Sequence, residues 1–540
     1  MTTTPWWRGA VVYQVYPRSM MDANNDGIGD IPGIISKLDY IASLGVDAIW
    51  VSPFFKSPMK DFGYDISDYR DIDPIFGTLA DFDELIAKAH ARGIKIIIDQ
   101  VLSHTSDQHA WFMESRESRD NAKADWYVWA DPQPDGTPPN NWLAIFGGSA
   151  WEWEPRRCQY YLHNFLKTQP DLNYHCPQVQ EQILSEVEFW LKRGVDGLRL
   201  DAIIFCFHDQ LLRNNPAKPE EERRGRGFRE DNPYAFQRHV YDCDRPENLQ
   251  FLEALRKLMD RYPGTVTLGE IASEDSLKTM AEYTAGTSRL HMAYSFELLV
   301  DQLSGTYIRE TIETLEKNLS EGWPCWSIGN HDVVRVMSRW GGKEPSPQLA
   351  KTLNAMLMSL RGSICSYQGE ELGLVEADIQ QHELQDPYGI TFWPRFKGRD
   401  GCRTPMPWTH QENHAGFSHA KTWLPIPSAH KECAVSLQEN DSGSILNAYR
   451  KFMHWRKQQP CLRLGDIEFV AAADDYVVFI RSFGREKLLC AFNFSASAQV
   501  ISLDAHYRLE KTEGHGCDSV STEGKVLSVS AYSTVIARVL

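Results

Sequence analysis

Residues 194–202 read GVDGLRLDA, a short apolar, strand-like run that ends at the carboxylate of Asp201. Two later runs end in the same way, TVTLGEIA (265–272) at Glu270 and SIGNHD (327–332) at Asp332. An acid at a strand end caps a following helix more often than it does chemistry. Three such acids together indicate a catalytic site, because the C-terminal ends of parallel strands meet at one mouth of a barrel. We therefore expect these three carboxylates to lie together.

Eight apolar, β-rich runs recur along the chain, and helical spacings separate them. The runs are VVYQVY (11–16), VDAIWVSP (46–53), IKIIIDQV (94–101), GLRLDA (197–202), TVTLGEI (265–271), HMAYSFEL (291–298), CWSIGNHD (325–332) and SICSYQG (363–369). Apolar residues at helical spacing include Ile34, Leu38 and Ile41; Phe82, Ile86 and Ala89; and Val179, Ile183, Val187 and Trp190. Such alternation predicts parallel βαβ units, and eight of them predict an α/β fold built on a closed (β/α)8 TIM barrel.

Two segments depart from this rhythm. Residues 105–174 are rich in Trp, Asp, Asn, Gly and Pro without a helical period, which indicates a subdomain inserted after the third strand. From residue 463 onward, short alternating runs such as YVVFIRSF predict a small all-β domain. The predicted organisation is a barrel over 1–104 and 175–462, an inserted subdomain over 105–174 and an antiparallel β domain over 463–540.

A long segment after the fourth strand, residues 208–248, contains the charged stretch NNPAKPEEERRGRGFREDNP. It is either a solvated loop or, because it follows a strand at the catalytic face of a barrel, a cap over the site.

Charge and cysteine content restrict the possible partners and the compartment. The chain has 56 Lys and Arg against 73 Asp and Glu, a net charge of −17, so nucleic acid and anionic membranes are poor partners. No run of about 18 apolar residues is present, and the first twenty residues do not resemble a signal peptide. Eleven cysteines, an odd number without CxxC pairs, fit reduced thiols. We expect a cytoplasmic protein that is a monomer or a homodimer.

Four separated motifs occur in a characteristic order, and two more support them. They are DQVLSH (99–104), GLRLDA (197–202), LGEIA (268–272) and GNHD (329–332), with QPDLNY (169–174) and GEELG (369–373). Over nearly its whole length the chain resembles the alpha-amylase superfamily, glycoside hydrolase family 13. QPDLNY resembles the branch that contains oligo-1,6-glucosidases and alpha-glucosidases.

This resemblance implies a role for each of the three acids. Asp201 is the expected nucleophile, Glu270 the general acid/base, and Asp332 the carboxylate that engages ring hydroxyls and favours the positive transition state. Glycosidic cleavage with retention requires such a pair, one carboxylate below the anomeric carbon and one protonated group at the leaving oxygen. Arg199, two residues before Asp201 on the same face of the strand, is placed to lower the pKa of Asp201.

The same resemblance implies the groups that hold the first sugar. They are Asp61, Tyr64, Asp99, His104, Arg199, His331 and Arg399. Asp61 and Arg399 would clamp the 4-hydroxyl of the terminal sugar and so make the enzyme exo-acting. Phe146 and Phe165 are either aromatic walls of the site or core residues. Ser103 stands where the family usually has Asn; a hydroxyl can still hydrogen-bond locally, but a calcium site at that position is not expected.

A different loop, DANNDGIGD (22–30), predicts one structural Ca²⁺ or Mg²⁺ ion. Oxygen ligands would come from alternate positions, namely Asp22, Asn24, Asp26, the carbonyl of Ile28, and Asp30. The loop resembles the first half of an EF-hand, although Gly33 stands at the twelfth position. The alternative is a polar turn without metal. No cofactor is expected for catalysis.

The residue after the nucleophile, Ala202, bears on the linkage. In this branch Val there accompanies α-1,6 cleavage, whereas Ala or Thr accompanies α-1,4 cleavage. We therefore expect a retaining, exo-acting alpha-glucosidase that acts on maltose and short oligosaccharides and transfers glucose to sugar or alcohol hydroxyls. Other activities of the same scaffold remain open: oligo-1,6-glucosidase, sucrose isomerase, trehalose synthase and trehalose-6-phosphate hydrolase. A non-catalytic sugar-binding relative is a remote alternative, because all three acids are present.

Overall fold

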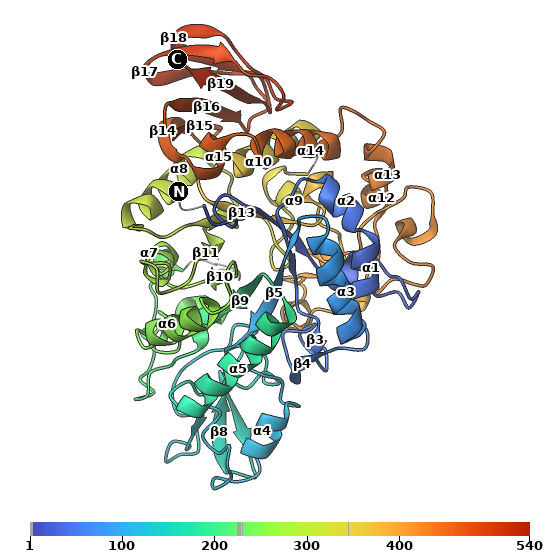
Figure 1. The fold of residues 1–540 in the computed structure, drawn as a ribbon. Helices are drawn as coiled ribbons and strands as arrows, with labels where there is room; N and C mark the ends of the chain where they lie inside the picture. The colour runs from blue at the N-terminus through green and yellow to red at the C-terminus, as the bar shows by residue number, and fades with distance from the viewer. Residues whose placement is uncertain (1–3, 224–227, 229–230, 344) are drawn as a thin grey trace.

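The computed structural model describes residues 4–223, 228, 231–343 and 345–540, and an eight-stranded parallel sheet forms its centre (Figure 1). The strands are β1 (Val11–Val15), β2 (Ala48–Val51), β5 (Lys95–Val101), β9 (Gly197–Asp201), β10 (Val266–Ile271), β11 (Met292–Ser295), β12 (Cys325–Trp326) and β13 (Ser363–Tyr367). Their order in the sheet is β11-β10-β9-β5-β2-β1-β13-β12. A parallel bridge between Ala293 and Pro324 brings β11 to the start of β12 and nearly closes the barrel. The predicted α/β barrel is confirmed.

Helices surround the sheet, and their ends follow from the sequence. Helix α5 (Pro177–Arg193) begins at a proline and ends before Gly194, which adopts a left-handed conformation (φ 101°). Helix α3 (Leu79–His90) begins with a capping box formed by Thr78 and Asp81. Further helices of this layer are α6 (Asn248–Met259), α7 (Ser276–Tyr283), α8 (Gly305–Asn318), α10 (Pro347–Ser359) and α14 (Ile445–Arg456).

The first predicted helical spacing runs through two short helices rather than one. These are α1 (Ile31–Ser36) and α2 (Leu38–Ser43), and the chain departs from helical geometry at Lys37 between them. Ile34, Leu38 and Ile41 are nevertheless fully buried. The apolar spacing therefore predicted which side chains pack on the sheet but not the break.

The chain between β5 and α5 forms a separate small layer, at the bottom of the view in Figure 1. It contains α4 (Ala110–Ser115) and an antiparallel sheet of β6 (Trp129–Ala130), β8 (Gln159–Leu162) and β7 (Trp151–Glu154). The rings of Trp142 and Trp151 stack in its core, with centroids 5.8 Å apart. A bridge between His104 and Asp171 joins it to the end of β5, so its loops lie against the mouth of the barrel.

The C-terminal sheet lies at the top of Figure 1 and is antiparallel throughout, with the order β14-β15-β16-β19-β17-β18. Its strands are β14 (Asp466–Ala473), β15 (Tyr476–Phe483), β16 (Glu486–Asn493), β17 (Gln499–Lys511), β18 (Thr522–Val529) and β19 (Thr534–Val539). Strand β18 was not predicted, because only Leu527 and Val529 among its residues are buried and the alternation is weak. Within the described residues, no helix is long and apolar enough to cross a membrane.

Candidate active site

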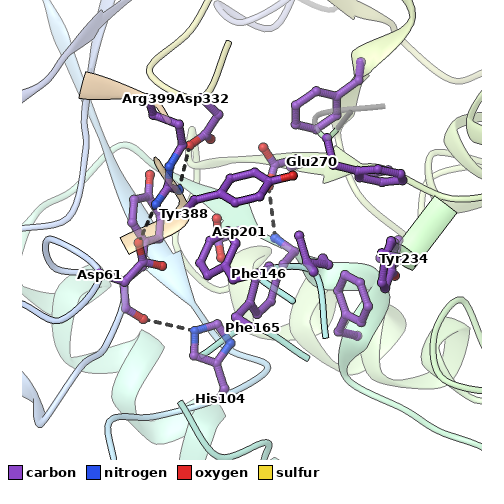
Figure 2. A pocket seen from close by; sticks show the side chains of 18 residues that line it. Asp61, His104, Phe146, Phe165, Asp201, Tyr234, Glu270, Asp332, Tyr388 and Arg399 are labelled. Carbon is purple, nitrogen blue, oxygen red and sulfur yellow. Dashed lines mark hydrogen bonds and ion pairs between the residues drawn. The ribbon is translucent and has the colours of Figure 1, made fainter. Parts of the chain in front are cut away.

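The three carboxylates lie around one pocket at the C-terminal mouth of the barrel (Figure 2). Asp201 is the last residue of β9, Glu270 lies near the end of β10, and Asp332 lies in the loop after β12. Of the twelve predicted catalytic and sugar-binding side chains, nine line this pocket. Those nine are Asp61, Tyr64, His104, Phe146, Phe165, Asp201, Glu270, Asp332 and Arg399. The remaining three, Asp99, Arg199 and His331, contact them from below.

Arg199 connects three of these carboxylates from a fully buried position. Its Nη1 donates to Asp99 Oδ1 (2.8 Å) and to Asp201 Oδ1 (2.7 Å), and its Nη2 lies 2.5 Å from Glu270 Oε1. The guanidinium also lies 4.8 Å from the centre of the Trp50 ring. One cation therefore fixes Asp201 and Glu270 relative to each other.

The pKa of Asp201 is higher than usual. Burial raises the pKa of Asp201, Arg199 lowers it, and the negative charges of Glu270, Asp99 and Asp332 raise it further, so that the net direction is upward. Burial likewise raises the pKa of Asp99 to about 6. Arg199 lowers the pKa of Asp201, as expected from the sequence, but burial and the neighbouring carboxylates raise this pKa by more. One arginine shared by three buried carboxylates cannot hold all of them ionised.

Asp332 is held in the charged form. Burial alone would raise the pKa of Asp332, but the cations of Arg399 and Arg403, together with His331 Nε2 at 3.3 Å, outweigh it and hold that pKa below its usual value. Oδ1 of Asp332 accepts from Arg399 Nη1 (3.2 Å) and from Arg403 Nη2 (2.9 Å). This carboxylate therefore presents a fixed negative charge to the pocket.

Arg399 also binds Asp61, the pair that the sequence resemblance implies. Its Nη2 donates to Asp61 Oδ1 (2.7 Å), and Gln169 Nε2 donates to the other oxygen of Asp61 (3.1 Å). A further buried carboxylate, Asp386, accepts from Arg399 Nη2 (2.8 Å) and Nε (3.1 Å). The bidentate contact with Asp386 fixes the plane of the guanidinium, and thereby the direction in which it meets Asp61 and Asp332.

A chain of hydrogen bonds determines the state of His331. Gln14 Nε2 donates to His331 Nδ1 (2.7 Å), so the hydrogen of the neutral ring is on Nε2, which donates to the Tyr64 hydroxyl. Tyr64 in turn donates to Asp99 Oδ2 (3.1 Å). Burial lowers the pKa of His331 well below its usual value, so His331 is a neutral donor at the base of the pocket.

His104 is also neutral, because burial lowers its pKa to about 4. Its Nε2 donates to the Tyr64 carbonyl (3.0 Å), and Nδ1 accepts from Ser103 Oγ (2.9 Å). The hydroxyl of Ser103 thus makes a local hydrogen bond where the family usually has an Asn.

Aromatic rings form the remaining walls, and some come from the long segment after β9. Phe146 and Phe165 both line the pocket, with ring centroids 5.8 Å apart. Phe228 and Tyr234, from the segment 208–248, line it as well. Asn232 Nδ2 joins this segment to the Ile145 carbonyl (2.8 Å). The segment therefore reaches over the pocket instead of extending into solvent; residues 224–227 and 229–230 of its charged stretch lie outside the described residues.

A family model described as the alpha amylase catalytic domain matches residues 14–465. The chain belongs to the alpha-amylase family. It is 55% identical over 536 residues to a probable alpha-glucosidase of Rhizobium meliloti (strain 1021), covering 99% of this chain and 97% of that protein. It is 37% identical to an oligo-1,6-glucosidase of Parageobacillus thermoglucosidasius, covering 93% and 92%. A crystal structure of the alpha-glucosyl transfer enzyme XgtA matches with a TM-score of 0.98 and 60% identity over 100% of both chains.

Membership of the alpha-amylase family identifies the chain as a glycoside hydrolase.

Three side chains of the site were not predicted from the sequence: Arg403, Gln169 and Asp386. Gln169 is the first residue of QPDLNY, a motif that the sequence analysis used, and Arg403 lies four residues after the predicted Arg399. Position next to predicted residues was the available signal for both. Asp386 lies in an irregular segment before α11 (Pro387–Phe392), and nothing in its local sequence indicates that it reaches Arg399.

The predicted metal loop lies away from this site of the alpha-amylase-type barrel, and its donor set is entirely oxygen. Both oxygens of Asp22 accept backbone N–H groups, from Asn25 (2.7 Å) and Gly27 (2.8 Å). Asp30 caps α1 through the N–H of Gly33 (2.6 Å). Among the described residues, no three His, Cys, Asp or Glu side chains converge as they would around a metal ion. Asn24 and Asp26, the loop's other side-chain donors, are exposed, and their Oδ1 atoms accept the N–H groups of Asp26 (2.9 Å) and Ile28 (2.8 Å).

Proposed function

We propose that the protein is a retaining, exo-acting alpha-glucosidase that removes terminal α-1,4-linked glucose from maltose and short oligosaccharides. The observation that carries this proposal is the shared contact of Asp201 and Glu270 with Arg199, at 2.7 and 2.5 Å. Two carboxylates that end adjacent strands and bind one guanidinium face a common point in the pocket. Retaining glycosidases need such a pair, roughly 5 to 5.5 Å apart, on either side of the glycosidic bond.

In the proposed reaction, a carboxylate oxygen of Asp201 attacks the anomeric carbon while Glu270 gives its proton to the leaving oxygen. The glycosidic bond breaks, and glucose becomes linked to Asp201 as an ester. Glu270, now ionised, removes a proton from water or from an acceptor hydroxyl, whose oxygen attacks the same carbon and releases Asp201. The ionised Asp332 stabilises the positive charge that develops on the ring in both steps.

The closed end of the pocket supports exo action, that is, removal of the terminal sugar. Asp61 and Arg399 form a buried ion pair (2.7 Å), and the Arg399 guanidinium lies 4.9 Å from the centre of the Phe146 ring. A sugar ring that enters first therefore meets a closed, hydrogen-bonding wall. We assign to this wall the recognition of the terminal glucose hydroxyls.

The aromatic rings on the other side support a preference for short substrates. Phe165, Phe205, Phe228 and Tyr234 line the pocket where the second sugar or an acceptor would lie. Rings there stack on the apolar face of a sugar and also accommodate an alcohol. Transfer of glucose to sugar or alcohol hydroxyls is therefore part of the proposed activity.

A time course of products from maltose, with and without a primary alcohol, tests this proposal. We expect glucose to appear first as the α-anomer, and an α-glucoside of the alcohol to accumulate while maltose remains. Initial release of β-glucose would contradict retention. Isomerised disaccharide as the main product, with little glucose, would show that the enzyme is an isomerase.

The linkage preference should respond to Ala202, which lines the pocket. We expect Ala202→Val to raise the rate ratio of isomaltose to maltose by about tenfold, the effect of a small change in apolar volume. Ala202 has a left-handed backbone conformation (φ 43°, ψ 37°), so a β-branched residue there also costs about 1–2 kcal/mol of folding free energy.

Ala202→Thr separates these two effects, because threonine carries the same branched strain. We expect it to lower the melting temperature as much as Ala202→Val while preserving the preference for maltose. An equal rise of the isomaltose ratio in both variants would contradict the linkage argument.

We also propose that the loop 22–30 holds one Ca²⁺ or Mg²⁺ ion that stabilises the fold. Chelation should lower the melting temperature, and elemental analysis of the purified protein should find one ion per chain. An ion at a concentration 100 times its dissociation constant stabilises the folded protein by about 2.7 kcal/mol.

Asp26→Ala should remove this stabilisation. Asp135→Ala is the matched control, since Asp26 and Asp135 are both exposed and each accepts the N–H two residues later (2.8 and 3.1 Å). Equal chelator sensitivity of both variants would contradict the site.

A further inference from the structure

Tyr294 is a buried residue of β11 that lies directly beside Glu270 in the parallel pair of β10 and β11. The mechanism above gives it no task. We infer that Tyr294 is a positioning residue that determines which oxygen of Glu270 carries the acid proton. This inference rests on the proposed function, because it assigns a task to the side chain next to the proposed acid.

The contacts of the Tyr294 hydroxyl are directional. The hydroxyl donates to Glu270 Oε1 (2.8 Å) and accepts from Arg199 Nη2 (2.9 Å) and Nε (3.2 Å). A guanidinium has only donors, so the hydroxyl hydrogen cannot point toward Arg199. It points toward Glu270, and the bond has one possible direction.

Glu270 Oε1 therefore receives two donors, Tyr294 Oη (2.8 Å) and Arg199 Nη2 (2.5 Å). A carboxyl oxygen has two lone pairs, and both are occupied at Oε1. The proton of the acid form must then be on Oε2. Oε2 accepts one weak contact from the backbone N–H of Ala202 (3.2 Å), which leaves one direction free. Glu270 lines the pocket (Figure 2), and we assign this free direction at Oε2 to the glycosidic oxygen.

The same contacts help the second half of the reaction. After the proton has left, Tyr294 and Arg199 both donate to a negative oxygen, and charge-assisted hydrogen bonds of this kind stabilise the ionised form. Without the hydroxyl, the ionised Glu270 would lose one of the two donors at Oε1, and the proton of the acid form would be shared between Oε1 and Oε2. Tyr294 thus keeps one oxygen as the proton carrier and eases proton release.

Tyr294→Phe tests the inference on two substrates. The value of kcat/KM for maltose should fall about 10- to 100-fold, whereas that for 4-nitrophenyl α-glucoside should stay within about threefold, since nitrophenolate leaves without an acid. The basic limb of the kcat/KM profile should move to higher pH. Unchanged substrate ratio and unchanged basic limb would overturn the inference.

Tyr283→Phe is the matched control. The Tyr283 hydroxyl is buried, donates to Asp244 Oδ1 (3.0 Å) and accepts from Asn248 Nδ2 (2.9 Å), but neither partner lines the pocket, whereas Glu270, the partner of Tyr294, does. We expect Tyr283→Phe to lower the melting temperature about as much as Tyr294→Phe does, but to keep wild-type kinetics. If Tyr283→Phe reproduced the kinetic changes, Tyr294 would have no particular role and the inference would fail.

Two further measurements keep the inference testable if Tyr294→Phe folds poorly. 3-Fluorotyrosine at position 294 keeps the ring and makes the hydroxyl a stronger donor, so it should move the basic limb to lower pH; no movement would overturn the inference. In the Glu270→Gln background, Tyr294→Phe should add no loss on maltose, because both act through one proton. Multiplied losses would overturn it as well. Wild-type maltose hydrolysis by Glu270→Gln itself would instead overturn the proposed function.

Discussion

Asp201→Asn should reduce maltose turnover by about 10⁴-fold or more and leave the fold intact. An amide at this position cannot form the ester with the anomeric carbon, and removal of a nucleophile costs losses of this order. The folded protein should not be destabilised, because the pKa of Asp201 is raised by its burial and by neighbouring carboxylates. An uncharged amide removes a charge that the folded site disfavours. A melting temperature equal to or above that of the wild type is expected.

Asp196→Asn is the matched control, since Asp196 precedes β9 and lies at the opposite end of the same strand. Its oxygens bind His90 Nε2 (2.6 Å) and Lys95 Nζ (2.9 Å). This variant should lose stability but keep turnover. Chemical rescue gives the second readout: azide should enter the space left in Asp201→Gly and yield β-glucosyl azide. Near-wild-type hydrolysis by Asp201→Asn would contradict the nucleophile.

The eight barrel strands could be predicted because each is a short, locally apolar run whose ends coincide with turn residues. The prediction of elements failed where the local sequence pattern does not determine the tertiary structure. The helical spacing of Ile34, Leu38 and Ile41 continues through the break at Lys37, because burial depends on which face meets the sheet. Strand β18 forms through its pairing with β17, although most of its side chains are exposed.

Within the site, residues inside ordered motifs could be assigned, and residues that reach the site from elsewhere could not. Asp386 contacts Arg399 from the other end of a segment that contains α11, and Tyr294 contacts Glu270 only because β10 and β11 are neighbours. The net direction of the Asp201 pKa could not be predicted, for a similar reason. A sequence shows the nearest positive charge, Arg199, but not the burial of the group or the number of carboxylates that share this charge.

Glu270→Gln should lower kcat for maltose by about 10²- to 10⁴-fold, the usual contribution of a general acid and base. Its signature should be a dependence on the leaving group. An aryl glucoside with a good leaving group needs no proton in the first step, so its glucose should transfer to Asp201 at a substantial rate. Water then attacks slowly, because no base remains to activate it. We expect a burst of the released phenol followed by a slow steady state.

Azide separates the two carboxylate roles, because it attacks without a base. With Glu270→Gln and an aryl glucoside, azide should accelerate the slow phase and yield α-glucosyl azide, whereas Asp201→Gly should yield the β-anomer. Glu154→Gln is the matched control: Glu154 is likewise a buried glutamate paired with an arginine, Arg116, at 2.5 Å, but it lies in the small sheet formed by β6, β7 and β8. It should lose stability without a change in rate or a response to azide. An unaccelerated slow phase in Glu270→Gln, or the β-azide as its product, would contradict the assignment of Glu270 as the acid/base.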